Sequence, residues 1–340
     1  MKYLLYGAIN SHNVLNETIY SILSFFSLPE KYVENYKIVI VTTFEKEMFG
    51  PLCSYSNIII EQITNEMAND WIDSELTYIF KVKIFILEFF FSKYKEDVVF
   101  VDSDTVFVKS PNEIFDILEE NKTVMNFRCM GIDEVVDAYQ LIDTKDIDDN
   151  DAKARLFFYR SIKQNREISS LISKRKKYIV PSNFAPFNSG LIGMQYKDMG
   201  ILDQVLDVCL SLCKKFGYVC SEEFAFSLIF TLSGKETIAV NDVVYHYLFE
   251  KRTRLIVANL LGYFHLDDKT EYEKFISEID PKANEINHIT IKELPYYMSF
   301  KLSYSTFNAH KKRINTYVEN FNSFKMNLSD AKSMHKKLNM

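Results

Sequence analysis

The stretch that decides the fold is DVVFVDSDTVFV, residues Asp97–Val108. Its four apolar residues, Val98–Val101, are typical of a strand buried inside a sheet, and two carboxylates, Asp102 and Asp104, follow directly. In open α/β sheets, ligands bind beyond the carboxyl ends of the strands. Hard divalent ions bind one or two carboxylates together with phosphate oxygens, so this spacing suits Mg²⁺ or Mn²⁺ bridging to a diphosphate. The alternative is an ordinary Asp-rich surface turn.

The segments before this stretch alternate between strand and helix patterns. Short β-branched or apolar runs predict strands at Tyr3–Ile9, Tyr36–Thr42 and Asn57–Ile63. Apolar residues at helical spacing predict helices at Asn13–Phe26 and Thr77–Lys93. Strands separated by helices indicate parallel βαβ units, in which helices cover both faces of the sheet.

The segments after the stretch predict an insertion and then a return to the core. A hydrophilic loop at Asp143–Asp151 precedes a helical pattern at Ala152–Lys177, which ends in the basic run Lys174–Lys177, so we expect a helical insertion at about 145–180. The later predicted elements are a buried segment, two helices and two strands: Phe184–Met194, Ile201–Phe216, Glu222–Leu232, Thr237–Leu248 and Leu261–Leu266. Together these patterns predict an α/β fold with a mixed, mainly parallel sheet flanked by helices.

The composition is that of a globular protein with a large core. The 340 residues are 47% hydrophobic and 15% aromatic, which excludes a disordered chain. The net charge of -6 gives no support for binding of nucleic acid by the whole domain. The five cysteines include no CxxC pair, and the N-terminus lacks a signal-peptide pattern, so we expect reduced thiols and a cytoplasmic protein.

The strand with its Asp-x-Asp motif resembles the corresponding segment of GT-A-fold glycosyltransferases, in particular those of the retaining family-8 type. Four other segments resemble that family in the same order along the chain: Tyr6–Asn10, Phe80–Ile84, Phe187–Leu191 and Ser221–Phe224. The resemblance extends over about residues 1–270. It implies a divalent metal ion, a nucleotide-sugar donor with UDP as its nucleotide, and a glycan or lipid-linked acceptor.

The resemblance also implies roles for single residues. The first-strand, basic-helix, metal and sugar-pocket segments bind the donor in that family, and Lys269 is a basic candidate near the leaving phosphate. The implied donor-binding residues are Ala8, Asn10, Lys81, Asp102, Ser103, Asp104, Ser189, Gly190 and Lys269. The family's acidic pair lies near the acceptor and the transferred sugar, so Glu222, Glu223 and Asn188 are the catalytic candidates. Lys81 and Lys83 lie two apart on a helix and do not share a face, so we expect at most one in the site and favour Lys81.

Each of these segments has an ordinary structural interpretation as well. Gly7 and Asn10 could end a core strand, and Asn188–Gly190 could form a common turn. The acids after Ser221 could match the dipole of a helix N-terminus that this serine caps.

A third metal ligand is implied by the resemblance, as a histidine on a late strand. The two candidates are His246, within Val244–Tyr247, and His265, which Lys269 follows four residues later. The distance along the chain from the acidic pair favours His265. The family's continuation after this histidine, Gly-x-x-Lys-Pro-Trp, is absent from the sequence. A structural histidine is the alternative at either position.

Three functions are consistent with these motifs. The first is glycosyl transfer that depends on a metal ion and retains the anomeric configuration. The second is a phosphatase of the haloacid-dehalogenase type, because Asp102–Val106 also fits the Asp-x-Asp-x-Thr/Val motif of that family. There Asp102 would be the nucleophile, although the motif then belongs on the first strand of the domain. The third is a sugar-binding protein without activity on the same fold.

The last forty residues differ in charge from the rest of the chain. Residues 301–340 contain eight Lys and Arg against two acids, so this tail carries +6 and the first 300 residues carry -12. We expect a catalytic domain at 1–300 and a basic helical tail at 301–340. The spacing of Tyr317, Phe321, Phe324 and Leu328 gives that helix an aromatic face, which can lie on an anionic membrane or pack on the catalytic domain.

Overall fold

The computed structural model of the chain describes residues 1–29, 33–73, 79–140, 150–173, 176–217, 221–247 and 257. The predicted strand Leu261–Leu266, the candidates His265 and Lys269, and the tail lie outside these residues. The described chain divides into two compact units. The first contains residues 1–126, 189–206 and 229–247, and the second contains residues 127–188 and 207–228.

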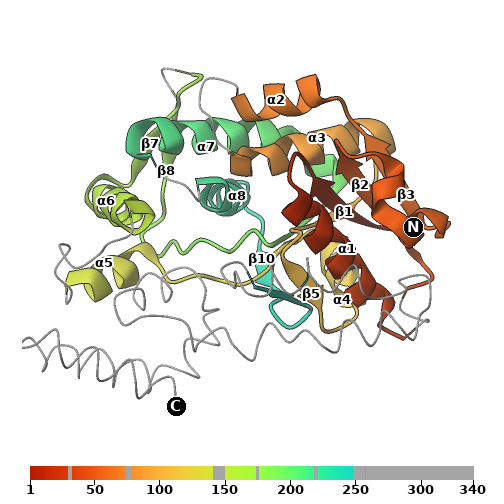
Figure 1. Cartoon of the computed structure of the whole chain (residues 1–340). Coiled ribbons are helices and arrows are strands. Elements are labelled where there is room, and N and C mark those ends of the chain that lie inside the picture. Colours follow the sequence, from red (N-terminus) through yellow and green to blue (C-terminus); the bar gives the residue numbers. More distant parts are fainter. Residues whose placement is uncertain are drawn as a thin grey trace, which may run out of the picture. The chain divides into compact units, whose positions relative to one another are not determined.

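A seven-stranded sheet forms the centre of the first unit (Figure 1). Its strand order is β10-β6-β9-β4-β1-β2-β3, with bounds Thr237–Ala239, Thr123–Met125, Leu191–Met194, Val98–Val101, Lys2–Ala8, Tyr36–Thr42 and Ile58–Gln62. β9 is antiparallel to β4 and β6, and the other neighbouring pairs are parallel. A separate antiparallel pair joins β5, Thr105–Phe107, to β11, Val244–His246.

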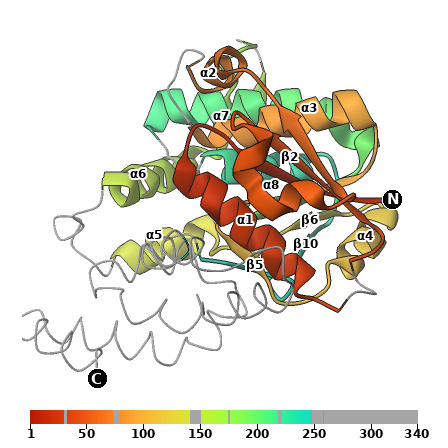
Figure 2. The same ribbon diagram turned by 45° about the vertical axis from the view of Figure 1, so that its right-hand side comes forward.

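Helices cover both faces of this sheet (Figures 1 and 2). Successive residues of β1 point to opposite faces, as the pleat of a strand requires. Leu4 and Tyr6 lie in the core with α1, His12–Phe26, and α4, Asn112–Glu119. Gly7 faces α3, Val82–Tyr94, so closely that an added Cβ would lie 2.4 Å from Ile86 Cδ1. The first unit also contains α2, Asn65–Asp73, and 3₁₀ turns at Lys46–Ser54, Ile79–Lys81 and Tyr196–Ile201.

The second unit is mainly helical. It contains α5, Ile132–Gln140, and α6, Asn150–Asn165, together with most of α7, Leu202–Phe216, and most of α8, Ser221–Leu232. An antiparallel hairpin of β7, Glu167–Ser169, and β8, Lys177–Ile179, follows α6.

The predicted α/β class, with its mixed and mainly parallel sheet flanked by helices, is confirmed. Three details of the prediction are corrected. The stretch at 97–108 is two strands, because the chain turns at the two aspartates. The segment at 152–177 is helical only to Asn165 and then forms the β7–β8 hairpin. The segment at 237–248 contains two short strands, β10 and β11.

Two further expectations concern cysteines and membrane spans. Cys53, Cys129, Cys209 and Cys213 are free thiols, while Cys220 lies outside the described residues. Among the helices that the structure describes, none has both the length and the apolar character needed to cross a bilayer.

Candidate metal centre

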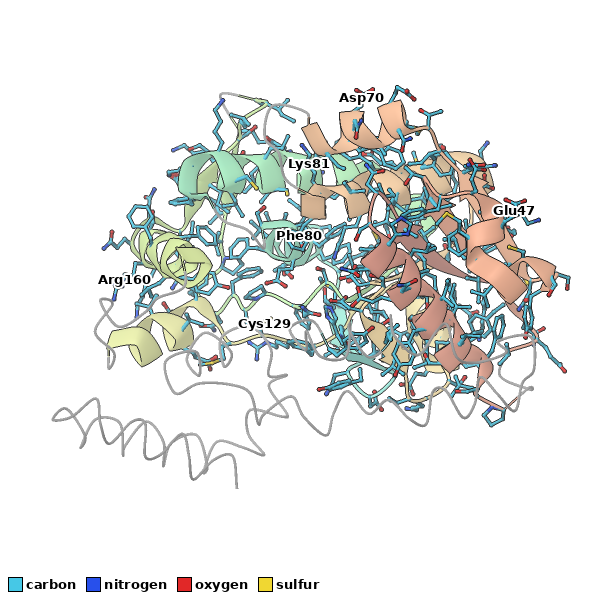
Figure 3. The ribbon with its side chains drawn as sticks, viewed as in Figure 1. Glu47, Asp70, Phe80, Lys81, Cys129 and Arg160 are labelled. Carbon is cyan, nitrogen blue, oxygen red and sulfur yellow. The ribbon has the colours of Figure 1, made fainter. Side chains whose placement is uncertain are left out.

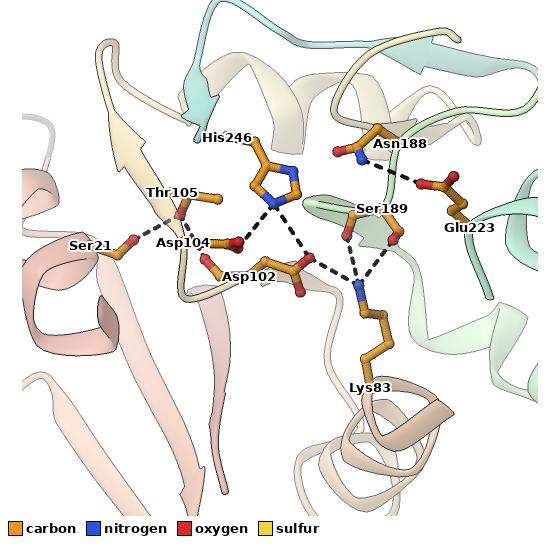
Figure 4. A network of polar contacts seen from close by, with 9 residues as sticks. All are labelled: Ser21, Lys83, Asp102, Asp104, Thr105, Asn188, Ser189, Glu223 and His246. Carbon is orange, nitrogen blue, oxygen red and sulfur yellow. Dashed lines mark hydrogen bonds and ion pairs between the residues drawn. The ribbon is translucent and has the colours of Figure 1, made fainter. Parts of the chain in front are cut away.

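Asp102 and Asp104 lie where β4 ends, in the turn that leads into β5 (Figure 4). Backbone contacts fix this turn, because Asp102 N donates to the carbonyl of Gly190 at 3.0 Å and Tyr247 N donates to the carbonyl of Asp104 at 3.0 Å. The hydroxyl of Thr105 donates to the carbonyl of Asp102 at 2.8 Å and lies 2.9 Å from the hydroxyl of Ser21 on α1. These contacts hold the backbone of the turn, which carries the two carboxylates, to the neighbouring chain segments and to α1.

His246 joins the two carboxylates from the last residue of β11. The register of the antiparallel pair places it opposite Thr105, the residue after Asp104. Its Nε2 lies 3.0 Å from Asp104 Oδ1 and 4.0 Å from Asp102 Oδ2. One ligand atom from each of the three residues lies within 4.8 Å of the others. Among the described residues, this is the one group of three or more such side chains.

Gly190 makes room for the imidazole of His246. A Cβ added to Gly190 would lie 2.1 Å from His246 Nδ1, which is far inside van der Waals contact. Because β9 runs beside β4, the residue that precedes β9 must lack a side chain for the ring to reach the aspartates. The predicted donor-site glycine is thus a close-packing residue for the histidine.

Lys83 contacts Asp102 from α3. Its ammonium donates to Asp102 Oδ2 at 3.0 Å, to Ser189 Oγ at 3.0 Å and to the Ser189 carbonyl at 3.3 Å. Both Lys81 and Lys83 are buried, so neither is a solvated surface lysine. Lys81 closes the 3₁₀ turn before α3, next to the partly exposed Phe80 (Figure 3).

The electrostatics of Asp102 favour a bound cation. Burial raises its pKa above the ordinary value, the positive charge of Lys83 and the neighbouring His246 lower it, and the negative charge of Asp104 raises it. The net direction is upward, so ionising both carboxylates is costly for the protein alone. A divalent cation beside them would remove that cost.

The donor set fits the predicted ion. Two carboxylate oxygens and an imidazole nitrogen suit Mn²⁺, and the oxygens alone suit Mg²⁺. The contact from Lys83 also matches a metal site, since side chains that bind a metal are usually oriented by a surrounding layer of hydrogen bonds.

The second unit holds the predicted catalytic residues together. Asn188 Nδ2 donates to Glu223 Oε2 at 3.4 Å, and all three of Asn188, Glu222 and Glu223 are buried. The backbone around Asn188 is fixed, because its N–H donates to the Phe127 carbonyl at 2.7 Å. The hydroxyl of Ser227 accepts from the Phe187 N–H at 2.8 Å and donates to the Glu223 carbonyl at 2.6 Å.

The remaining predicted residues lie at the ends of β1 and β4. The carbonyl of the buried Ala8 accepts from the Thr42 hydroxyl at 2.6 Å. Asn10 is exposed and has a left-handed backbone, with a φ of 54°, and its N–H donates to the Thr43 hydroxyl at 3.0 Å. Ser103 is half-buried between the two aspartates.

The sequence favours His265 and Lys81 over His246 and Lys83, which the structure places at the aspartates. His265 lies outside the described residues, and Lys81 is buried in the turn before α3. No local pattern identifies His246, because the register of β5 with β11 sets its neighbours. For Lys83, a helix that begins at Val82 turns position 83 toward the sheet.

Comparison with known proteins gives distant structural likenesses. No protein-family model matches the chain, and no curated protein matches it. Among solved structures, the bifunctional glycosyltransferase WbbM is 14% identical, with a TM-score of 0.42 over 76% of this chain and 44% of that one. The galactosyltransferase LgtC, bound to donor and acceptor sugar analogues, is 10% identical, with a TM-score of 0.39 over 69% of this chain and 72% of that one. Mouse xyloside xylosyltransferase 1 is 10% identical, with a TM-score of 0.45 over 70% and 84%.

The chain spans less than half the length of WbbM. All three of these proteins are glycosyltransferases by name, but likeness this distant carries no argument about activity.

Proposed function

We propose that the chain is a metal-dependent glycosyltransferase that moves a hexose from a nucleotide-sugar, with UDP as the nucleotide, to a glycan or lipid-linked acceptor. The observation that carries the proposal is the group formed by Asp102, Asp104 and His246 at the carboxyl end of β4. This is the edge of an open α/β sheet at which ligands bind. The motif segments in the sequence support the same assignment.

The residues of the first unit suit a diphosphate. When bound, a divalent ion on Asp102, Asp104 and His246 would act as a Lewis acid toward the leaving group. The positive charge of Lys83 lies in the same group and both orients Asp102 and adds to the field at this edge of the sheet. On the predicted sugar-pocket segment, Ser189 contacts Lys83 and Gly190 packs against His246. Asn10 and the main chain of Ala8, at the end of β1, are proposed for the base and ribose.

Asn188, Glu222 and Glu223 are proposed for the transferred sugar and the acceptor. Asn188 directly precedes Ser189 in the chain and is oriented by Glu223. Retaining chemistry needs no strong protein base, because the leaving phosphate can accept the proton of the acceptor. The resemblance favours that course; an inverting course would need Glu222 or Glu223 as the base.

The phosphatase alternative is not favoured. Its motif belongs on the first strand of a domain, whereas three strands precede β4 in the chain. The histidine beside Asp104 also has no role in a mechanism that uses Asp102 as nucleophile and Asp104 as acid and base. The sugar-binding alternative without activity shares the fold and is separated by experiment.

The test is incubation with Mn²⁺ in the absence of acceptor, once with UDP-hexoses and once with a phosphomonoester, with the products identified. A transferase releases sugar and UDP slowly, a phosphatase releases phosphate from a phosphomonoester, and a binding protein releases neither. Asp104→Asn should lose the activity. The matched control is Asp70→Asn, which changes an exposed aspartate on α2 (Figure 3). Phosphate release, or no release by a protein that binds UDP, would reject the proposal.

A further inference from the structure

The β7–β8 hairpin of the second unit is fixed to α7 by one buried carboxylate. Asp207 Oδ1 accepts from the N–H groups of Leu171 and Ile172 at 3.0 Å and 3.1 Å. Asp207 Oδ2 accepts from the hydroxyls of Ser170 and Tyr178 at 2.6 Å and 2.8 Å. Burial alone would raise the pKa of Asp207, but these hydrogen bonds outweigh it and lower the pKa. The carboxylate therefore stays charged and holds the turn rigidly.

The hairpin presents apolar side chains to the outside. The backbone of Ile172 is bound to Asp207, yet its side chain is 67% exposed. Ile179, on the outer face of β8, is 53% exposed. Core packing does not require either isoleucine. A fixed hairpin that exposes two large aliphatic side chains is typical of a surface that contacts an apolar partner.

Exposed lysines lie in the same hairpin as these isoleucines. Lys176 and Lys177 are both exposed, whereas Arg166, just before β7, is paired with Asp133. Glu167 pairs with Lys177 across the hairpin at 3.0 Å.

Helix α7 adds to the same charge. Its Ser211 accepts from the Leu171 N–H at 2.8 Å, one turn after Asp207. Lys214 and Lys215, exposed at the end of α7, lie one further turn along this face, because residues three and four apart on a helix are neighbours. The hairpin turn and the end of α7 thus bring positive charge together.

We propose that the β7–β8 hairpin and the last turn of α7 form a contact surface for an anionic phospholipid membrane. Ile172 and Ile179 would enter the interface, and Lys176, Lys177, Lys214 and Lys215 would lie at the level of the headgroups. Aliphatic side chains flanked by lysines are complementary to such a surface, since lysine stems follow apolar material while their charged ends remain in water. A soluble polyanion would satisfy the lysines but would leave the isoleucines exposed, so the membrane is the partner that accounts for both.

Tryptophan fluorescence tests the contact directly. In the full chain carrying Ile172→Trp, the added indole should shift its emission to shorter wavelength with vesicles of anionic phospholipid, but not with zwitterionic vesicles. The shift should fade at high salt, because screening shortens the reach of the lysines. The signal of Trp71 is subtracted with the parent protein.

A second pair of variants measures the affinity. Ile172→Ser with Lys176→Gln should weaken vesicle binding on the order of tenfold, since each basic residue near an anionic surface contributes several-fold. The matched control is Met48→Ser with Lys46→Gln, an exposed apolar and basic pair in the first unit, which should bind as the parent does. Circular dichroism verifies that both variants are folded.

Two results would overturn the proposal. Vesicle binding without an emission shift would place the contact elsewhere in the chain, such as the basic tail. An equal shift with soluble polyphosphate would show recognition of a polyanion rather than a membrane. None of these measurements needs transferase activity, so they stand or fall independently of the proposed function.

Discussion

His246 Nε2 lies 3.0 Å from Asp104 Oδ1, although the two residues are 142 positions apart in the chain. The pairing of β5 with β11 brings them together, because it sets His246 opposite Thr105. The three candidate metal ligands thus come from one tight turn and one short late strand.

Removing the histidine should weaken metal binding. For His246→Ala we expect the dissociation constant for Mn²⁺ to rise at least about tenfold, because metal sites respond by that much even to changes beside their ligands. Calorimetric titration measures this. His12→Ala is the control, since His12 is exposed at the start of α1 and should leave the constant unchanged. Unchanged binding in His246→Ala would remove this residue from the site.

A methyl group added at Gly190 should also weaken metal binding, because it would displace the imidazole of His246. The new Cβ would lie 2.1 Å from His246 Nδ1, so the ring must move away from Asp104. We expect Gly190→Ala to lose about 1–3 kcal/mol of stability, as overpacking does, together with Mn²⁺ affinity. At Gly200, an added Cβ meets nothing within 4 Å, which makes Gly200→Ala the control. Equal behaviour of the two variants in thermal unfolding and metal titration would contradict this account of the packing.

Lys83 should control how protons compete with the metal. Burial raises the pKa of Asp102 and Lys83 opposes that rise. In Lys83→Met this opposing positive charge is lost, so the pKa of Asp102 should rise further. Metal binding requires the ionised carboxylate, so the pH below which Mn²⁺ affinity falls should move upward.

The measurement is Mn²⁺ affinity as a function of pH. Lys93→Met, on the same helix, serves as the comparison, because Lys93 is paired with Glu61 away from the aspartates. If Mn²⁺ affinity falls at the same pH in the parent and in Lys83→Met, the charge of Lys83 does not affect the pKa of Asp102.

Asp207 should stabilise the fold in a pH-dependent way. Its pKa is lowered in the folded state, so its contribution is present above the unfolded value near 4 and is lost as the pH falls through the folded value. We expect Asp207→Asn to lower the free energy of unfolding by about 2 kcal/mol at neutral pH, the scale of a hydrogen bond to a charged group. Denaturant titrations of both proteins should converge in strong acid. A constant difference at every pH would show that the charge is irrelevant.

The sequence predicted most of the sheet because its strands are continuous apolar runs. The bounds of β2 agree with the predicted Tyr36–Thr42. A strand that is buried on both faces of a parallel sheet is a continuous apolar run, so its ends are visible in the sequence. α7 was also placed within one residue at its start, because its apolar face has clear helical spacing. The Asp-x-Asp turn followed from the same logic, as the end of a buried strand.

Elements that depend on tertiary contacts could not be predicted. The β7–β8 hairpin is three residues long on each side, and Asp207 from a distant helix holds its turn in addition to the local bond from the Ser173 N–H to Ser170. His246 was ranked second because its neighbours are defined by strand pairing, which the chain order does not reveal. The contact of Lys83 with Asp102 could not be predicted for a similar reason. It depends on where α3 begins, and the exact ends of a helix are poorly defined by sequence.

Sugar transfer should depend on a divalent ion held by Asp102, Asp104 and His246. This dependence is measured as the rate of UDP release from a UDP-hexose while Mn²⁺ is titrated into the metal-free parent protein and the Asp104→Asn variant. We expect saturable activation of the parent, loss of activity in EDTA, and a rate at least about a hundredfold lower in the variant, because several kcal/mol of charge stabilisation are lost. Equal release in EDTA, or a variant as fast as the parent, would show that transfer does not depend on this metal site.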